Sequence, residues 1–160
     1  MSPGPIRSRP IRALIRSFGP AEDVVSVEES RPESPGPGRV RVQMKAAAIN
    51  PSDLVTISGA YAHRTPLPFV PGFEGVGIVE ETGEGVAHLV PGDRVLPIGD
   101  AGAWQDLKIA EARWCFRVDP GLSLDQAAMS YINPLTAWLM LHERAEIGPA
   151  TTMVLNAAGS

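Results

Sequence analysis

A short polar segment in the first half of the chain carries residue types that can donate or relay a proton. Asn50, Ser52 and Asp53 follow an apolar, alternating stretch, and Tyr61 comes eight residues after Asp53. A tyrosine hydroxyl with its ordinary pKa of about 10 is protonated at neutral pH, so it can donate to developing negative charge. The alternatives are structural: the first three residues suit a helix-capping turn, and Tyr61 suits a loop aromatic that packs over a strand end.

Composition limits the classes of protein that can hold this segment. The chain has 160 residues, of which 44% are hydrophobic and 20% charged, so we expect a soluble globular domain with its own core. Glycine and proline, 16 of each, predict a loop-rich and β-rich fold. A net charge of −4 without a basic patch argues against a nucleic-acid partner. No apolar run approaches the ~20 residues of a membrane span.

The single cysteine, Cys115, cannot form a disulfide within the chain, and it excludes a cysteine-rich zinc site. Its neighbours Trp114 and Phe116 favour a buried, unreactive thiol.

The N-terminus allows two interpretations. Its first acidic residue is Glu22, and the arginines and serines before it are typical of a mitochondrial transit peptide. However, residues 11–19 (IRALIRSFG) also alternate, with Ile11, Ala13 and Ile15 on one face. We expect a first strand there, preceded by a loose tail over residues 1–10.

Further strands are predicted along most of the chain. Residues 39–45 (RVRVQMK) alternate strictly between polar and apolar, which indicates a half-buried strand, and residues 24–29 are its expected partner. Residues 75–83, whose glycines suggest bulges or close backbone approach, and segments near 91–99 and 103–110 read as further short strands. Many short strands separated by turns predict a mainly β fold, a small barrel or sandwich.

The pattern becomes helical at Ser123, which forms a capping box with Gln126. Asn133 is the expected N-cap of a second helix that begins at Pro134. An apolar strand over residues 151–156 then runs into small residues, which is how a dinucleotide-binding βαβ unit opens; an edge strand of the barrel is the alternative. On the first interpretation the chain is a fragment or a truncated product.

Four segments resemble motifs of one family and occur in the same order as in that family: AAAINPSD, PFVPGFEGVGIVEETGEGV, PGDRV and YINPLTAWLML. The chain from about Ile11 to Ser160 resembles the medium-chain dehydrogenases/reductases, and most closely their zinc-free quinone oxidoreductases and mitochondrial-type 2-enoyl thioester reductases. The resemblance implies a GroES-like β-barrel catalytic domain over residues 11–122. Residues 123–160 would hold the linking helices and first strand of a truncated Rossmann domain.

The resemblance also implies that no catalytic metal is present. Zinc-dependent relatives place a cysteine where Asn50 stands and a histidine where Phe73 stands, and neither an amide nor a phenyl ring replaces those ligands. Glu74, beside Phe73, is then expected to be a structural charge of the barrel. Without the Lewis acid, reduction of an activated C=C bond or of a quinone is the expected chemistry.

The family's site residues carry over as expectations. Tyr61 stands at the position of the enoyl reductases' catalytic tyrosine, although His63 and Arg64 after it replace a more usual glycine- or asparagine-rich flank. Ser52 matches a residue of the proton relay near the nicotinamide. The expected NADPH-binding residues are Asn50, Thr136, Asn156, Ala157, Ala158, Gly159 and Ser160.

The resemblance therefore implies an NADPH-dependent 2-enoyl thioester reductase, with an NADPH:quinone oxidoreductase as the alternative on the same scaffold. A catalytically inactive GroES-like fragment is the alternative of another class, and we expect the 160-residue chain alone to be inactive. The expected partner is a small-molecule substrate, with no membrane or nucleic acid. The expected full-length form is a cytoplasmic homodimer, or a mitochondrial one if the N-terminus is a transit peptide.

Overall fold

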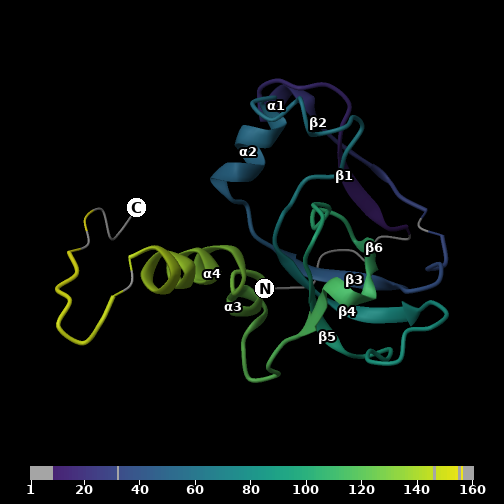
Figure 1. Ribbon diagram of the computed structural model, residues 1–160. Helices are drawn as coiled ribbons and strands as arrows, with labels where there is room; N and C mark the ends of the chain where they lie inside the picture. The colour runs from purple at the N-terminus through teal and green to yellow at the C-terminus, as the bar shows by residue number, and fades with distance from the viewer. Residues whose placement is uncertain (1–8, 32, 146, 155, 157–160) are drawn as a thin grey trace.

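Antiparallel strands dominate the computed structural model, which describes residues 9–31, 33–145, 147–154 and 156 (Figure 1). A two-stranded sheet pairs β1 (Ile11–Ile15) with β2 (Val25–Glu29). The larger sheet has the strand order β6-β3-β4-β5-β7. Its strands are β3 (Arg39–Ala47), β4 (Gly75–Thr82), β5 (Arg94–Pro97), β6 (Leu107–Glu111) and β7 (Cys115–Arg117).

The helices are short and lie between or after the strands. They are α1 (Ala21–Val24), α2 (Pro51–Ile57), the 3₁₀ turn η1 (Ala112–Trp114), α3 (Leu124–Ala128), α4 (Ile132–Leu139) and the π-helical turn η2 (Met140–Arg144). The predicted mainly β fold with few helices is confirmed. Within the described part of the chain, no helix is long and apolar enough to cross a membrane.

The barrel core forms around β3, whose alternation is as predicted. Val40 and Val42 are fully buried, and they pack with Val79 of β4 and Val95 of β5 in one apolar cluster. Gly77 of β4 lies so close to β3 that a Cβ there would meet Val42 Cγ1 at 2.5 Å. Glycine is therefore required at this point of close backbone approach.

Residues 24–29 were predicted to pair with the strand at 39–45, and this prediction is wrong. β2 pairs with β1 instead, from Val25 against Ile15 to Glu29 against Ile11, while β4 and β6 occupy the two sides of β3. Both edges of β3 are thus taken by strands far along the chain, and alternation within a segment does not specify its partner.

A buried lysine and a tryptophan fasten the loop between β5 and β6 to the barrel. Lys108 donates from Nζ to the carbonyl oxygens of Pro97 at 3.0 Å and of Asp100 at 2.7 Å. Burial lowers the pKa of Lys108 to about 8, although the nearby Asp100 and Cys115 oppose the shift. Trp104 donates from Nε1 to the Ala48 carbonyl oxygen at 3.0 Å, which fixes the backbone just before α2.

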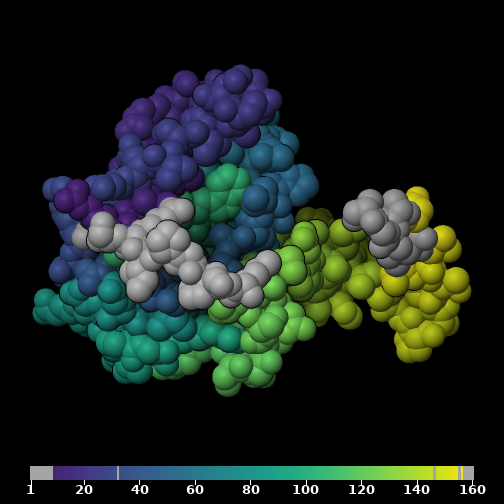
Figure 2. Space-filling model, turned by 180° about the vertical axis from the view of Figure 1, so that it is seen from behind, coloured from purple at the N-terminus to yellow at the C-terminus, as the bar shows by residue number. Residues whose placement is uncertain are grey.

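The C-terminal helices project from the barrel, as the yellow-green segment of Figure 2 shows. The predicted capping box is present in α3, because Gln126 N donates to Ser123 Oγ at 3.2 Å and Ser123 N donates to Gln126 Oε1 at 3.0 Å. α4 has no buried residue. The predicted strand over residues 151–156 is not formed in 151–154 and 156, since a strand needs a neighbour to satisfy its backbone groups.

Candidate active site

The polar segment at residues 50–53 begins α2, and its cap is held by a buried carboxylate. Asp53 accepts the Asn50 amide hydrogen at Oδ2, at 2.8 Å, and the Phe73 amide hydrogen at Oδ1, at 3.1 Å. Burial raises the pKa of Asp53, while these backbone hydrogen bonds act in the opposite direction. The capping turn considered for Asn50 and Asp53 is therefore real, and it also ties α2 to the segment that precedes β4.

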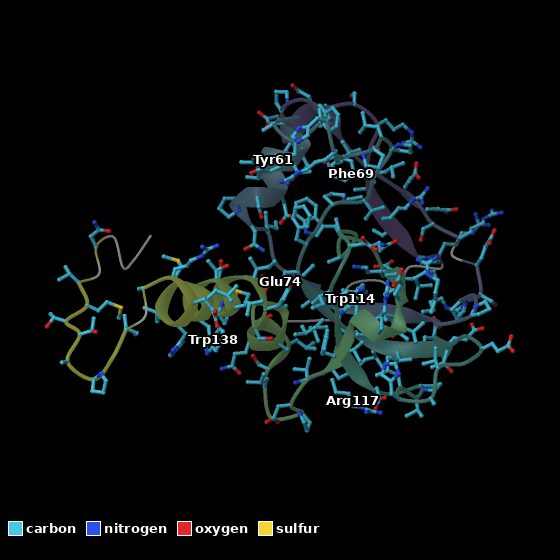
Figure 3. All side chains as sticks on the ribbon, in the orientation of Figure 1. Tyr61, Phe69, Glu74, Trp114, Arg117 and Trp138 are labelled. Atoms are coloured by element: carbon cyan, nitrogen blue, oxygen red, sulfur yellow. The ribbon has the colours of Figure 1, made fainter. Side chains whose placement is uncertain are left out.

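Glu74 connects this cap to the start of α4. Its Oε1 accepts the backbone N–H groups of Tyr131 and Ile132, each at 2.8 Å, and its Oε2 accepts Asn50 Nδ2 at 3.2 Å. The side chain is only 2% exposed, and Figure 3 shows Glu74 where the barrel meets the C-terminal helices. A structural role for this carboxylate was expected, but its partners, 57 and 58 positions away, were not.

These two hydrogen bonds explain why the prediction of Asn133 as N-cap is wrong. α4 begins at Ile132, with Asn133 and Pro134 inside its first turn. The first backbone N–H groups of a helix lack partners within it, and a carboxylate satisfies them well because it also favours the positive end of the helix dipole. Pro134 has no N–H to satisfy and is tolerated in the first turn.

Ser52 and Tyr61, the two predicted catalytic residues, line one pocket of about 400 Å³. Ser52 comes from the first turn of α2 and Tyr61 from the turns after it. The remaining lining residues are Thr56, Arg64, Thr65 and Phe73. Thr56 could have been found from the sequence, since it follows Ser52 by one helical turn. In the structure it donates from Oγ1 to the Ser52 carbonyl oxygen at 2.8 Å.

A run of turns after α2 positions Tyr61. Gly59 has φ of +94°, and a Cβ there would meet Phe18 Cβ at 2.9 Å, so only glycine fits. The Arg64 amide donates to the Tyr61 carbonyl oxygen at 3.0 Å, which brings the Arg64 side chain back over Tyr61. The guanidinium carbon then lies 4.2 Å from the centroid of the phenol ring.

The predicted cofactor residues lie in three places. Asn50 is buried beside the pocket residue Ser52, and its Nδ2 is engaged by Glu74. Thr136 is exposed on α4 and donates from Oγ1 to the Ile132 carbonyl oxygen at 2.7 Å. Asn156 is exposed at the end of the chain. Ala157, Ala158, Gly159 and Ser160 lie outside the described residues.

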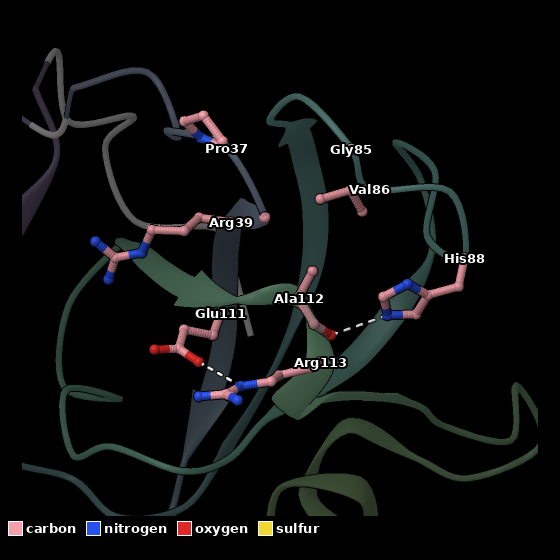
Figure 4. Close-up of a pocket in the computed structure, with 9 residues that line it drawn as sticks. Pro37, Arg39, Gly85, Val86, His88, Glu111, Ala112 and Arg113 are labelled. Carbon is pink, nitrogen blue, oxygen red and sulfur yellow. Dashed lines mark hydrogen bonds and ion pairs between the residues drawn. The ribbon is translucent and has the colours of Figure 1, made fainter.

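A second, larger pocket of about 600 Å³ lies elsewhere on the barrel and contains none of the predicted site residues (Figure 4). It is formed by the turns before β3 and after β4 together with η1. His88 donates from Nε2 to the Ala112 carbonyl oxygen at 3.0 Å, and Arg113 pairs with Glu111 at 2.6 Å. His88, Arg113 and Glu111 are thereby engaged, and no predicted site residue lines this pocket, so the pocket of Ser52 and Tyr61 is the better candidate for chemistry.

The chemistry open to the candidate site follows from its side chains. The pocket presents a phenol, three aliphatic hydroxyls and one guanidinium, which suits hydrogen-bond donation and charge stabilisation around a substrate oxygen. No three His, Cys, Asp or Glu side chains of the described residues form a group that could hold a metal ion. Cys115 is buried, and burial raises its pKa to about 11, in agreement with the unreactive thiol expected for it.

Comparison with known proteins shows the family to which the chain is similar. Residues 36–122 match the family described as "Alcohol dehydrogenase GroES-like domain". The synaptic vesicle membrane protein VAT-1 homolog of Rattus norvegicus is 30% identical over 93% of the chain and 37% of its own length. The mitochondrial enoyl-[acyl-carrier-protein] reductase of Arabidopsis thaliana is 35% identical over 97% of the chain and 42% of its own length.

A solved structure of a similar protein has the same fold as this chain. The putative NADPH:quinone reductase from Bacillus thuringiensis superposes with a TM-score of 0.83 at 40% identity, over 88% of this chain and 43% of that one. The chain thus spans about 40% of the length of the relatives it matches. It belongs to the alcohol dehydrogenase GroES-like domain family of the medium-chain dehydrogenases/reductases, with relatives in the zinc-free branch of quinone oxidoreductases and enoyl reductases.

Proposed function

We propose that the protein is an NADPH-dependent oxidoreductase that reduces the C=C bond of a 2-enoyl thioester, with Tyr61 as the proton donor. The observation that supports this most is the pocket shared by Ser52 and Tyr61, which joins a proton-donating phenol to an additional hydroxyl. The relatives named as mitochondrial enoyl-[acyl-carrier-protein] reductases support the choice of substrate class.

NADPH, when bound, supplies a hydride to an electron-poor carbon of the substrate. The residues of the pocket then stabilise the negative charge that moves to the thioester oxygen. Tyr61 transfers its phenolic proton to the carbon next to the carbonyl, which completes the C–H bond, and the Ser52 hydroxyl can donate a hydrogen bond to the enolate oxygen.

The described residues fit part of a nicotinamide-nucleotide site. Asn50 donates from Nδ2 to Glu74 and lies two positions before the pocket residue Ser52, so its amide stands beside the pocket. Thr136 and Asn156 present exposed polar groups on the C-terminal segment. We assign these residues to NADPH together with the small residues 157–160, which lie outside the described part of the chain.

The variant Tyr61→Phe tests the proposal in the full-length protein. It removes one hydroxyl and keeps the ring under Arg64, so the fold should be preserved. Turnover of a 2-enoyl thioester should fall by about 10²–10⁴ with little change in KM, because the interaction grows only as charge develops.

The matched control is Tyr131→Phe, since Tyr131 is the chain's other tyrosine and contacts Glu74 through its backbone N–H alone. That variant should keep native turnover. Near-native rates in Tyr61→Phe would remove Tyr61 from the mechanism.

Quinone reduction is the second candidate activity, favoured by the 40% identity to the protein named as a putative NADPH:quinone reductase. A reduced quinone can take its protons from water, so Tyr61→Phe should reduce quinone turnover much less than enoyl turnover. The same variant therefore separates the two activities. For the full-length protein we propose a homodimer acting in the cytoplasm on a small-molecule substrate.

A further inference from the structure

Arg64 is an exposed cation at the candidate site without a carboxylate partner among the described residues. Two other arginines of the larger sheet are ion-paired: Arg41 lies 2.7 Å from both Glu80 and Glu81, and Arg117 lies 2.8 Å from Asp93. Arg64 instead lies over the Tyr61 ring and lines the pocket.

The lining of the pocket makes this one charge effective. Besides the guanidinium it contributes only hydroxyls, a phenol and the Phe73 ring, with no carboxylate. Asp53 is the closest acid in sequence to Ser52, but it is 1% exposed and its two oxygens accept the amides of Asn50 and Phe73. The pocket is therefore positive in an acidic chain of net charge −4.

The stacked geometry suits recognition of an oxyanion. A guanidinium placed over an aromatic ring uses its face for the cation–π contact, so the N–H groups along its edge remain able to donate. Two of them can bind a carboxylate or phosphate in parallel. The backbone hydrogen bond from Arg64 to Tyr61 closes the turn that carries both side chains.

We propose that Arg64 binds an anionic group of the substrate, so that the Ser52–Tyr61 pocket selects oxidised acceptors that carry a carboxylate or a phosphate. The inference depends on the proposed function for the identity of the reaction but not for the binding of the anion. The anionic group that Arg64 binds can come from either of two sources: a phosphate of the thioester carrier or a carboxylate on the acceptor itself.

Two matched pairs of probes distinguish these sources by binding alone. Crotonyl-coenzyme A and crotonyl-N-acetylcysteamine share the enoyl thioester, but only the first carries phosphates. Monomethyl fumarate and dimethyl fumarate share a C=C bond, but only the first carries a carboxylate. Calorimetry gives each Kd, and NMR shifts of the Ser52 and Tyr61 amides locate the binding.

The native protein should bind the anionic member of at least one pair about 10-fold more tightly than the neutral member, with the preference weakening as salt rises. Arg64→Gln should abolish the preference, and Arg64→Lys should restore part of it. Arg39→Gln is the matched control, because Arg39 is also an exposed arginine without an ion pair among the described residues, but it lines the second pocket. This control should keep the preference.

Equal affinities within both pairs for the native protein, or a preference that survives in Arg64→Gln, would overturn the assignment. So would an equal loss in Arg39→Gln, which would indicate general electrostatic attraction. Loss of the proposed activity is a separate result, because Tyr61→Phe tests turnover and leaves the Arg64 charge in place.

Discussion

Replacing Glu74 tests whether one carboxylate joins the barrel to α4. Its Oε1 accepts two backbone N–H groups at 2.8 Å, those of Tyr131 and Ile132, and α4 has no buried residue to hold it otherwise. We compare Glu74→Gln, which keeps the shape and one carbonyl oxygen, with Glu74→Ala, which removes both acceptors.

The magnitude follows from the hydrogen bonds. Bonds to a charged acceptor contribute roughly 1.5–3 kcal/mol each and neutral ones about 0.5–1.5, so two bonds weaken by about 2 kcal/mol in Glu74→Gln. Relief of the cost of burying a charge offsets part of this loss, and we expect a net destabilisation of about 1 kcal/mol. Glu74→Ala leaves the two backbone amides and Asn50 Nδ2 without their acceptor, at about 1–3 kcal/mol each, so we expect a loss of at least about 3 kcal/mol.

Urea denaturation measures the global free energy of unfolding, and amide hydrogen exchange at Tyr131 and Ile132 measures the local effect. Exchange at these two amides should speed up by about 10-fold in Glu74→Gln and more in Glu74→Ala. Glu84→Gln is the control, since Glu84 is exposed and its variant should stay within about 0.5 kcal/mol of native. Native stability in Glu74→Ala, with unchanged exchange at both amides, would refute this account of how α4 begins.

Two further variants test other parts of the site's support. The pKa of Lys108 is lowered from 10.5 to about 8 in the folded state, so between these pH values the unfolded chain binds more protons and stability should rise with pH. Urea denaturation at pH 7.5, 9 and 10.5 measures this rise. The variant Lys108→Met should lack up to about 3 kcal/mol of it relative to native. A difference between the two proteins that does not change with pH would contradict the lowered pKa of Lys108. Gly59 has φ of +94°, and an added Cβ would lie 2.9 Å from Phe18 Cβ, so Gly59→Ala should lower stability by at least about 1 kcal/mol and shift the Tyr61 NMR signals. The control Gly36→Ala, whose Cβ would meet nothing within 4 Å, should do neither. Similar effects of the two changes would show that the turn is not constrained.

Several features of the fold could be predicted from short stretches of sequence. The alternation of residues 39–45 predicted β3 and the burial of Val40 and Val42, because side chains of a strand point to opposite faces at a fixed period. The spacing of Ser123 and Gln126 predicted the cap of α3, because both partners lie within one helical turn. The single cysteine between two aromatic residues predicted a buried thiol.

Pairing and packing at long range were decided by the tertiary structure. Residues 24–29 joined β1 rather than β3, since β4 and β6 satisfied both edges of β3. The position of Asn133 suggested a cap, but Glu74 satisfied the amides of Tyr131 and Ile132 and started α4 earlier.

The candidate site shows the same division. Residue types alone indicated that Tyr61 could act as a proton donor, because a phenol is one of the groups that serve in general acid catalysis. Its place in a pocket with Ser52, under Arg64 and beside Phe73, arises from a left-handed turn at Gly59 and from the Phe73 amide bound to Asp53, 20 positions away. The type of a side chain is given by the sequence, whereas its neighbours depend on which distant segments bury their backbone polar groups together.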